Sequence, residues 1–319
     1  MKKILAMGLA LSMCAVPFTA FAEEEVTPES LMEAMEEYSQ SVTSMSMPMT
    51  LNLNASLSVA SEDAPETAFD ILLNGGFDVK YILNPMTMSM NGEFEVSAMG
   101  MDEGMSMEMY MTSSEDGSTI DSYVNMIAAD EESGWQHTTM DMTELFAAFG
   151  VSSMEELSSM SVEDLLGMDS VLEWTVEETD TTYELSSQLL FSDLMPIIED
   201  SMGLAGEELG EEEMAIIESV LGAFTMNMSY SLDKETKAAL TAHIDFNDSD
   251  LTVINQLISM FMSYDSESEE GSTTETTLTL NDFSIDMTYT YDDVEEIVVP
   301  EEALNAETID ANDVLEELE

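Results

Sequence analysis

The clearest pattern in the chain is the strict alternation of apolar and polar residues from Met45 to Val59. Met, Leu, Ala or Val occupies every odd position, and Ser, Pro, Thr or Asn occupies every even one. Successive side chains of a strand point to opposite faces of its sheet. This period of two therefore predicts one long strand with an apolar face and a polar face.

The same period of two recurs along most of the chain. It predicts further strands over residues 69–83, 86–98, 105–111, 119–127, 134–140, 171–177, 182–190, 224–232, 240–246 and 276–291. Short polar turns join them, one of them at residues 102–104, and this is typical of an antiparallel sheet. Gly75-Gly76 predicts a bulge or sharp bend, and the change of parity at Asn281-Asp282 predicts a bulge or turn. Ile297–Pro300 is expected to close the sheet.

Helical spacing replaces the strand pattern in a few places. We expect helices over residues 23–41, 142–149, 154–166, 192–201, 211–221 and 251–262. Thr27 suits the N-cap of the first helix, and Pro28 suits its first turn. The fold class is therefore α+β, with a large curved antiparallel sheet. It forms a single domain over residues 23–300, and residues 301–319 form an acidic C-terminal tail.

The N-terminus has the features of a signal peptide over residues 1–22. Lys2 and Lys3 precede an apolar run, and Ala20-Phe21-Ala22 forms an A-x-A cleavage site. We expect cleavage after Ala22 and a secreted or extracytoplasmic protein of the cell envelope. Cys14 is the only cysteine, and it has two interpretations. It either carries a lipid within a lipobox-like flank or, as we favour, leaves with the signal peptide.

The chain is extremely acidic. It contains 68 Asp and Glu residues, and the five Lys and Arg residues are all lysines. Such a charge repels nucleic acid and anionic surfaces, so no nucleic-acid partner is expected. The carboxylates are scattered and lack the spacing of a calcium loop. We interpret them as a solvated surface that keeps an exported monomer soluble.

The order of the elements resembles a known architecture. A short helix comes first, long alternating strands, a helical middle and more strands follow, and the last segment is of the D-x-V-x-x-I-x-x-P type over residues 292–300. Over about residues 27–300 the chain resembles the half-barrel superfamily of the lipoprotein carrier LolA and the LppX-type envelope lipoproteins. More narrowly, it resembles exported Met-rich bacterial proteins of unknown function in the M-x-M-x-M strand after Pro85, the M-S-M-E-M-Y-M strand over residues 105–111, and Gly134-Trp135 after a polar loop. The resemblance implies a half-barrel with helices on its concave face, an apolar cavity for acyl chains, and no catalytic residues.

The 31 methionines are the strongest functional signal. Methionine is flexible and polarizable, and it suits surfaces that meet varied apolar partners. We interpret the apolar strand faces as a lining that either fills a core or binds a ligand. The candidate lining residues are Met47, Met49, Leu51, Leu53, Phe69, Ile71, Phe77, Met86, Met88, Met90, Phe94, Met107, Met109, Met226 and Met228. Leu257, Met260 and Phe261, in the apolar helix over residues 251–262, are the candidate gate.

Catalytic chemistry has little support. No G-x-S-x-G, H-E-x-x-H or phosphate-binding loop is present, and the mature chain lacks Cys and Arg. His137 and His243 are expected to be exposed strand residues. We therefore predict no enzyme, no catalytic residue, no cofactor and no metal site of the usual His, Cys and carboxylate type.

The sequence leaves three functions open. The first is a binding protein for an apolar small molecule or lipid, with a transient membrane or envelope-protein partner. The second is a Cu(I) or Ag(I) scavenger that uses thioethers, as in Met86-Met88-Met90. The third is a cell-surface structural or interaction module that has a filled core and no small ligand. We favour the first.

Overall fold

The computed structural model describes residues 26–61, 64–83, 85–98, 100–114, 117–128, 134–142, 172–195, 210–264 and 274–310. Several expectations lie outside these residues. They concern the signal peptide with Cys14, most of the helices over residues 142–149 and 192–201, all of the helix over residues 154–166, and residues 311–319.

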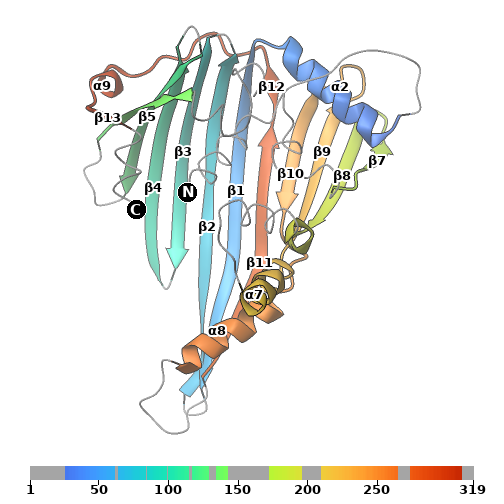
Figure 1. Cartoon of the computed structure of the whole chain (residues 1–319), viewed down its shortest axis with the longest axis vertical. Coiled ribbons are helices and arrows are strands. Elements are labelled where there is room, and N and C mark those ends of the chain that lie inside the picture. Colours follow the sequence, from blue (N-terminus) through green and yellow to red (C-terminus); the bar gives the residue numbers. More distant parts are fainter. Residues whose placement is uncertain are drawn as a thin grey trace.

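The first half of the chain forms an antiparallel meander that starts in the middle of a sheet (Figure 1). Its strands are β1 (Ser44–Ser61), β2 (Ala64–Leu83), β3 (Met86–Ala98), β4 (Met101–Ser113), β5 (Thr119–Ala128) and β6 (Gln136–Asp141). Each strand pairs with the next, so the chain moves outward from β1 to β6. The alternation in the sequence thus becomes one continuous sheet.

The second half of the chain approaches the same centre from the opposite edge. Its strands are β7 (Thr175–Glu178), β8 (Thr182–Leu190), β9 (Thr225–Asp233), β10 (Ala239–Asp245), β11 (Thr274–Thr288) and β12 (Thr290–Tyr291). β11 and β12 pair with β1, which joins the two meanders at the middle of the sheet. β13 (Thr308–Asp310) then adds to β6 in parallel. The edges of the sheet are therefore β13 and β7, and the sheet is not closed.

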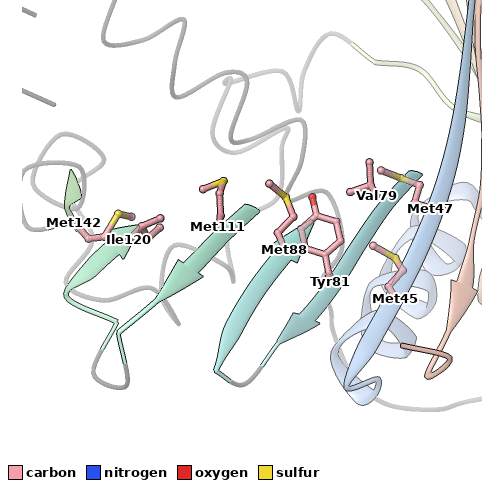
Figure 2. Packing of buried hydrophobic residues seen from close by; sticks show 8 residues of the cluster. All are labelled: Met45, Met47, Val79, Tyr81, Met88, Met111, Ile120 and Met142. Atoms are coloured by element: carbon pink, nitrogen blue, oxygen red, sulfur yellow. The ribbon is translucent and has the colours of Figure 1, made fainter. Parts of the chain in front are cut away.

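The strand register puts the apolar residues of both meanders on one side of the sheet. Met47 of β1 pairs with Val79, Val79 pairs with Met90, and Met90 pairs with Met109. Directly paired residues share a face, so this row continues from strand to strand. We call this side the Met face. Figure 2 shows labelled side chains of β1 to β5 pointing to the same side of the sheet, together with Met142, which lies one residue beyond β6.

Two buried clusters pack on the Met face. The larger one, the Met core, contains Met45, Met47, Val79, Tyr81, Met88, Met111, Ile120 and Met142. The smaller one contains Leu31, Tyr183, Leu185, Leu232 and Ala239. Tyr289 packs against both clusters and so connects them. Helix α2 (Pro28–Ser41) contributes Leu31, which places this helix against β8, β9 and β10 (Figure 1).

The other helices within the described residues are short. They are the 3₁₀ helix η1 (Phe191–Leu194), α7 (Glu211–Leu221), α8 (Thr252–Tyr264) and α9 (Glu301–Leu304). Thr27 caps α2 as expected, in a capping box with Ser30, and Pro28 is in its first turn. The structure confirms the predicted class, α+β and mostly β, with a large antiparallel sheet that is not closed and a few short helices.

Some of the local predictions are confirmed and others are wrong. The expected bulge is confirmed, because Asn54 pairs with Asp282 and Ala55 with Leu280, which leaves Asn281 as the extra residue. The bulge expected at Gly75-Gly76 is wrong, because the pairing with β3 runs through both residues without a shift, and the alternative, a sharp bend, stays a prediction. The turn expected at residues 102–104 is also wrong. The chain turns at Gly100, whose positive φ of 79° suits glycine, and residues 102–104 belong to β4.

The expected closing strand at residues 297–300 is wrong, because these residues lie in no strand. Asp292 has a left-handed backbone with a φ of 56°, and its carboxylate accepts hydrogen bonds from the backbone N–H and the hydroxyl of Thr43. Ser46 also donates a hydrogen bond to Asp293. These contacts hold residues 292 and 293 against the start of β1. Residues 301–310, expected to belong to the tail, contain α9 and β13.

Candidate ligand-binding face

All fifteen candidate lining residues lie on the Met face. They occupy odd positions of β1, β2 and β4 and even positions of β3 and β9. The strand register places these positions on the same face of the sheet. In one direction from β1 this follows from the pairs β1–β2, β2–β3 and β3–β4, and in the other direction from the pairs β1–β11, β11–β10 and β10–β9. Their use as a ligand-binding surface remains a prediction.

The structure divides the candidates into two groups. Seven of them belong to the Met core or pack against it: Met47, Met49, Phe77, Met86, Met88, Met90 and Met109. The other eight are half-buried and lie outside that cluster: Leu51, Leu53, Phe69, Ile71, Phe94, Met107, Met226 and Met228. The Met core is packed protein interior. The second group, together with Phe246 and Phe283, is a half-buried part of the Met face that lies outside this cluster, and we call it the lower zone.

Aromatic rings give the lower zone its shape. Phe94 pairs with Gly75, and an added Cβ at Gly75 would lie 2.3 Å from Phe94 Cδ1, so the ring covers the glycine. The rings of Phe94 and Phe77 meet edge to face with centroids 4.7 Å apart. On the other side of β1, Phe246 and Phe283 stack with centroids 4.8 Å apart. The lower zone is thus a broad, rigid aromatic and aliphatic floor.

Sequence reasoning missed the residues that β11 contributes to this floor. Phe283 pairs with Leu53, and Ile285 pairs with Leu51. Their alternation was visible in the sequence. Their position beside β1, more than two hundred residues away, requires a long-range pairing that no local pattern encodes.

Three methionines of the Met face are largely exposed. The exposed fraction is 62% for Met101, 39% for Met105 and 61% for Met126. Met101 and Met105 lie at the start of β4, and Met126 pairs with Met107 near the end of β5. This corner of the Met face therefore presents thioethers to solvent.

The candidate gate lies in α8. Leu257 is half-buried, whereas the side chains of Met260 and Phe261 lie outside the described part of the structure. The helix is held against β11, because the amide of Asn255 bonds both to the N–H of Leu278 (2.7 Å) and to its carbonyl (2.9 Å). Ser259 also donates a hydrogen bond to the carbonyl of Thr276. β11 extends beyond its pairing with β10, so backbone groups in this part of β11 have no partner on β10. The contacts from α8 provide hydrogen-bond partners for them.

The three lysines within the described residues are engaged away from the lower zone. Lys80 lies on the opposite, polar face and pairs with Asp78 at 2.9 Å, and this hydrogen bond and charge raise the pKa of Lys80. Lys234 pairs with Glu178 at 2.7 Å, and that hydrogen bond raises the pKa of Lys234. Lys237 lies over the ring of Tyr183.

The histidines occupy different environments. His137 is not exposed as expected. It stacks on Tyr123, its Nε2 lies 3.0 Å from Asp121 Oδ1, and its Nδ1 lies 2.9 Å from Thr308 Oγ1. It therefore joins β5, β6 and β13. His243 has the expected polar-face position, 2.7 Å from Asp286 Oδ1, and is partly exposed.

Two further searches bear on the site. Among the described residues, no group of three or more His, Cys, Asp and Glu side chains is placed to hold a metal ion. Likewise, no helix within the described ranges has the length and apolarity needed to cross a membrane. Both statements are limited to those residues.

One depression of about 550 Å³ lies near the lower zone but on the other side of the sheet. Glu93, Glu95, Ser106 and Ile127 line it, and the register gives all four the parity of the polar face. Phe94 is the one candidate lining residue that borders it. This depression is therefore distinct from the predicted apolar site.

The fold and the site together define a class of protein, a wide open β-sheet with one continuous Met-rich face. Within that class, the chain belongs to a family of unknown function, DUF6612, whose model matches residues 27–308. Among solved structures, it is similar to a beta-barrel-like protein of the domain of unknown function DUF1849 from Brucella abortus, with a TM-score of 0.21 and 8% identity. That match covers 77% of this chain and 96% of the other. No curated protein matches the chain.

Proposed function

We propose that this protein is an exported, non-enzymatic binding protein that holds an apolar ligand, such as a lipid or acyl chain, against the lower zone of the Met face. One observation carries the proposal. The apolar residues of both meanders share one face, and the eight candidates that neither belong to the Met core nor pack against it are half-buried there, as are the five that pack against it. A large partly accessible apolar surface is typical of a binding site.

The chemistry of the lower zone suits a ligand of variable shape. Apolar burial contributes about 25 cal/mol per Å² without directional constraints. Met107, Met226 and Met228 are flexible, whereas the Phe77–Phe94 and Phe246–Phe283 pairs are rigid. A rigid floor beside adaptable thioethers would accept several chain lengths. The resemblance of the sequence to LolA-like carriers supports the same ligand class, and the signal peptide supports an extracytoplasmic location.

Native mass spectrometry of the mature protein, purified without detergent, tests this proposal. We expect a stoichiometric lipid or acyl adduct, either as purified or after incubation with mixed lipids. Met107→Ser should weaken binding because it places a hydroxyl on the lower zone. Ile127→Ser is the matched control, because Ile127 is 44% exposed on the polar face of the neighbouring strand. A protein that stays free of adducts in mixed lipids would overturn the proposal and favour the interaction module.

A thioether site for Cu(I) or Ag(I) is the second candidate function. The register sets Met88 opposite Met111 and Met90 opposite Met109, so four thioethers lie on two adjacent strands. Soft thioether ligands select Cu(I). Replacing Met86, Met88 and Met90 with Leu keeps the apolar volume, so apolar binding should survive and Ag(I) binding should not. Unchanged Ag(I) binding in this variant would exclude the site.

A further inference from the structure

The exposed corner of the Met face combines thioethers with a carboxylate. It consists of Met101, Glu103, Met105 and Met126, and we call it the corner patch. Glu103 lies between Met101 and Met105 on β4, with the same parity, and all four side chains are exposed. Residues two apart on a strand are about 6.6–6.8 Å apart. A single ligand segment could therefore contact the carboxylate and its neighbouring thioethers together.

The pairing makes the corner patch continuous with the lower zone. Met105 pairs with Phe94, and Met126 pairs with Met107, which are both candidate lining residues. Glu103 pairs with Val96, so a carboxylate lies within an otherwise apolar row. Exposed thioethers at the margin of an apolar floor are typical of an adaptable binding surface.

The charges of the chain decide which partner fits. Its 68 acidic residues and its lack of arginine give a formal charge of −63, which attracts cations and repels anions. Lys80, Lys234 and Lys237 are the lysines of the described residues, and each is engaged elsewhere. Nothing cationic among the described side chains therefore competes for Glu103. An acidic peptide or an anionic lipid would meet repulsion at the corner patch.

We propose that the corner patch and the adjoining lower zone bind a basic amphipathic peptide segment. Its apolar stripe would lie on Met101, Met105 and Met126 and continue over Phe94, while a Lys or Arg at the margin of that stripe would pair with Glu103. An amphipathic helix carries its apolar residues at a spacing of three and four, which matches a broad apolar floor bordered by charge. This inference rests on the proposed function, because it uses the same face, and it adds a second class of ligand to the lipid or acyl chain proposed above.

Titration of the mature protein with three fluorescent peptides of equal length tests the inference. The first is an amphipathic Lys/Leu helix, the second is its Glu/Leu counterpart, and the third has the Lys/Leu composition in an order that destroys the apolar stripe. We expect the first to bind at least tenfold more tightly than either of the others in 0.15 M salt. Equal binding of the two Lys/Leu peptides would mean attraction by charge alone and would overturn the inference.

Substitutions then locate the binding. Glu103→Gln should weaken the amphipathic Lys/Leu peptide roughly two- to fivefold, as expected for one exposed ion pair. Glu108→Gln is the matched control, because Glu108 is also exposed on β4 but lies on the polar face. Replacing Met101, Met105 and Met126 with Ser should weaken binding at least tenfold. Equal effects of the two Gln variants, or no effect of the Ser variant, would overturn the assignment to the corner patch.

Binding of an uncharged apolar dye distinguishes a failure of this inference from a failure of the proposed function. If the dye binds the Met face and Met107→Ser weakens it, while the basic peptide shows no preference, the apolar-ligand function stands and the peptide inference fails. If neither the dye nor the amphipathic peptide binds, both fail. Circular dichroism of each variant verifies that the sheet is intact, as expected for substitutions at exposed positions.

Discussion

The ring of Phe77 lies against Gly92 of the neighbouring strand, so that an added Cβ at Gly92 would come within 2.6 Å of Phe77 Cδ1. The same arrangement occurs one pair further along, where the ring of Phe94 covers Gly75. The two rings then meet edge to face. Each glycine therefore provides the space that a ring occupies, and the two pairs interlock β2 and β3 at the border between the Met core and the lower zone.

Gly92→Ala should destabilise the protein by about 1–3 kcal/mol, because the added methyl group overpacks a site that is already filled by a ring. Urea unfolding measures the change. Gly104→Ala on β4 is the control, because its added Cβ would meet nothing nearer than 3.9 Å. It should be neutral or slightly stabilising, since alanine restricts the unfolded chain. Equal losses in the two variants would contradict the ring contact.

Asn255→Ala should loosen α8 from β11. The Asn255 amide makes two hydrogen bonds to the backbone of Leu278, and each such bond contributes roughly 0.5–1.5 kcal/mol, so we expect a loss of about 1–3 kcal/mol. Hydrogen exchange at the amide of Leu278 is the direct measurement, and it should become faster. Gln256→Ala is the control at the next, exposed position. Unchanged protection of Leu278 would show that apolar contacts alone hold the helix.

Local periodicity was enough to predict which residues share a face. In β1 and β2 the alternation is nearly unbroken, and the direct pairs Met47–Val79 and Met49–Phe77 join residues that the alternation assigns to the apolar face of each strand. The bulge at Asn281 was also predictable, because a change of parity has no other simple cause in a strand. Side-chain period is a property of the backbone itself, so it does not depend on the rest of the fold.

The local predictions were wrong where one type of residue or segment is compatible with several backbone structures. Glycines at 75 and 76 are compatible with a bulge, a bend or a covering ring, and only the position of Phe94 distinguishes these uses. The apolar run at residues 297–300 looked like a strand but lies in none, and Asp292, shortly before it, accepts hydrogen bonds from Thr43 next to the start of β1. The strand β13 has three residues, which are too few to show an alternation of apolar and polar positions in the sequence. It forms by pairing with β6.

Asp292→Asn should lower stability at neutral pH. The hydrogen bonds from Thr43 hold the pKa of Asp292 below its ordinary value of 3.8. The contribution of this carboxylate is therefore complete above that value and is lost as the pH falls through the lower pKa of the folded state. Asparagine also tolerates the left-handed backbone at this position, so the variant tests mainly the charge.

The measurement is urea unfolding of the wild type and the variant between pH 7 and pH 2. The stability gap between them should be largest at neutral pH and should narrow below about pH 3.8. Glu296→Gln removes the same charge a few residues further on, and it serves as the reference for the general effect of lowering the net charge. A gap that stays constant over the whole range would contradict the role of the ionised carboxylate.

Oxidation should follow the exposure of the methionines and so map the Met face. Peroxide converts accessible thioethers to sulfoxides. Met101 and Met126 are 62% and 61% exposed, whereas Met88 is 4% and Met142 is 0% exposed. Peptide mass mapping after brief treatment should find Met101 and Met126 modified first and the Met core last. In 6 M urea all four should react at similar rates, which controls for local sequence. Early oxidation of Met88 in the folded protein would mean that the Met core is open, and the apolar ligand would then have to be sought there rather than in the lower zone.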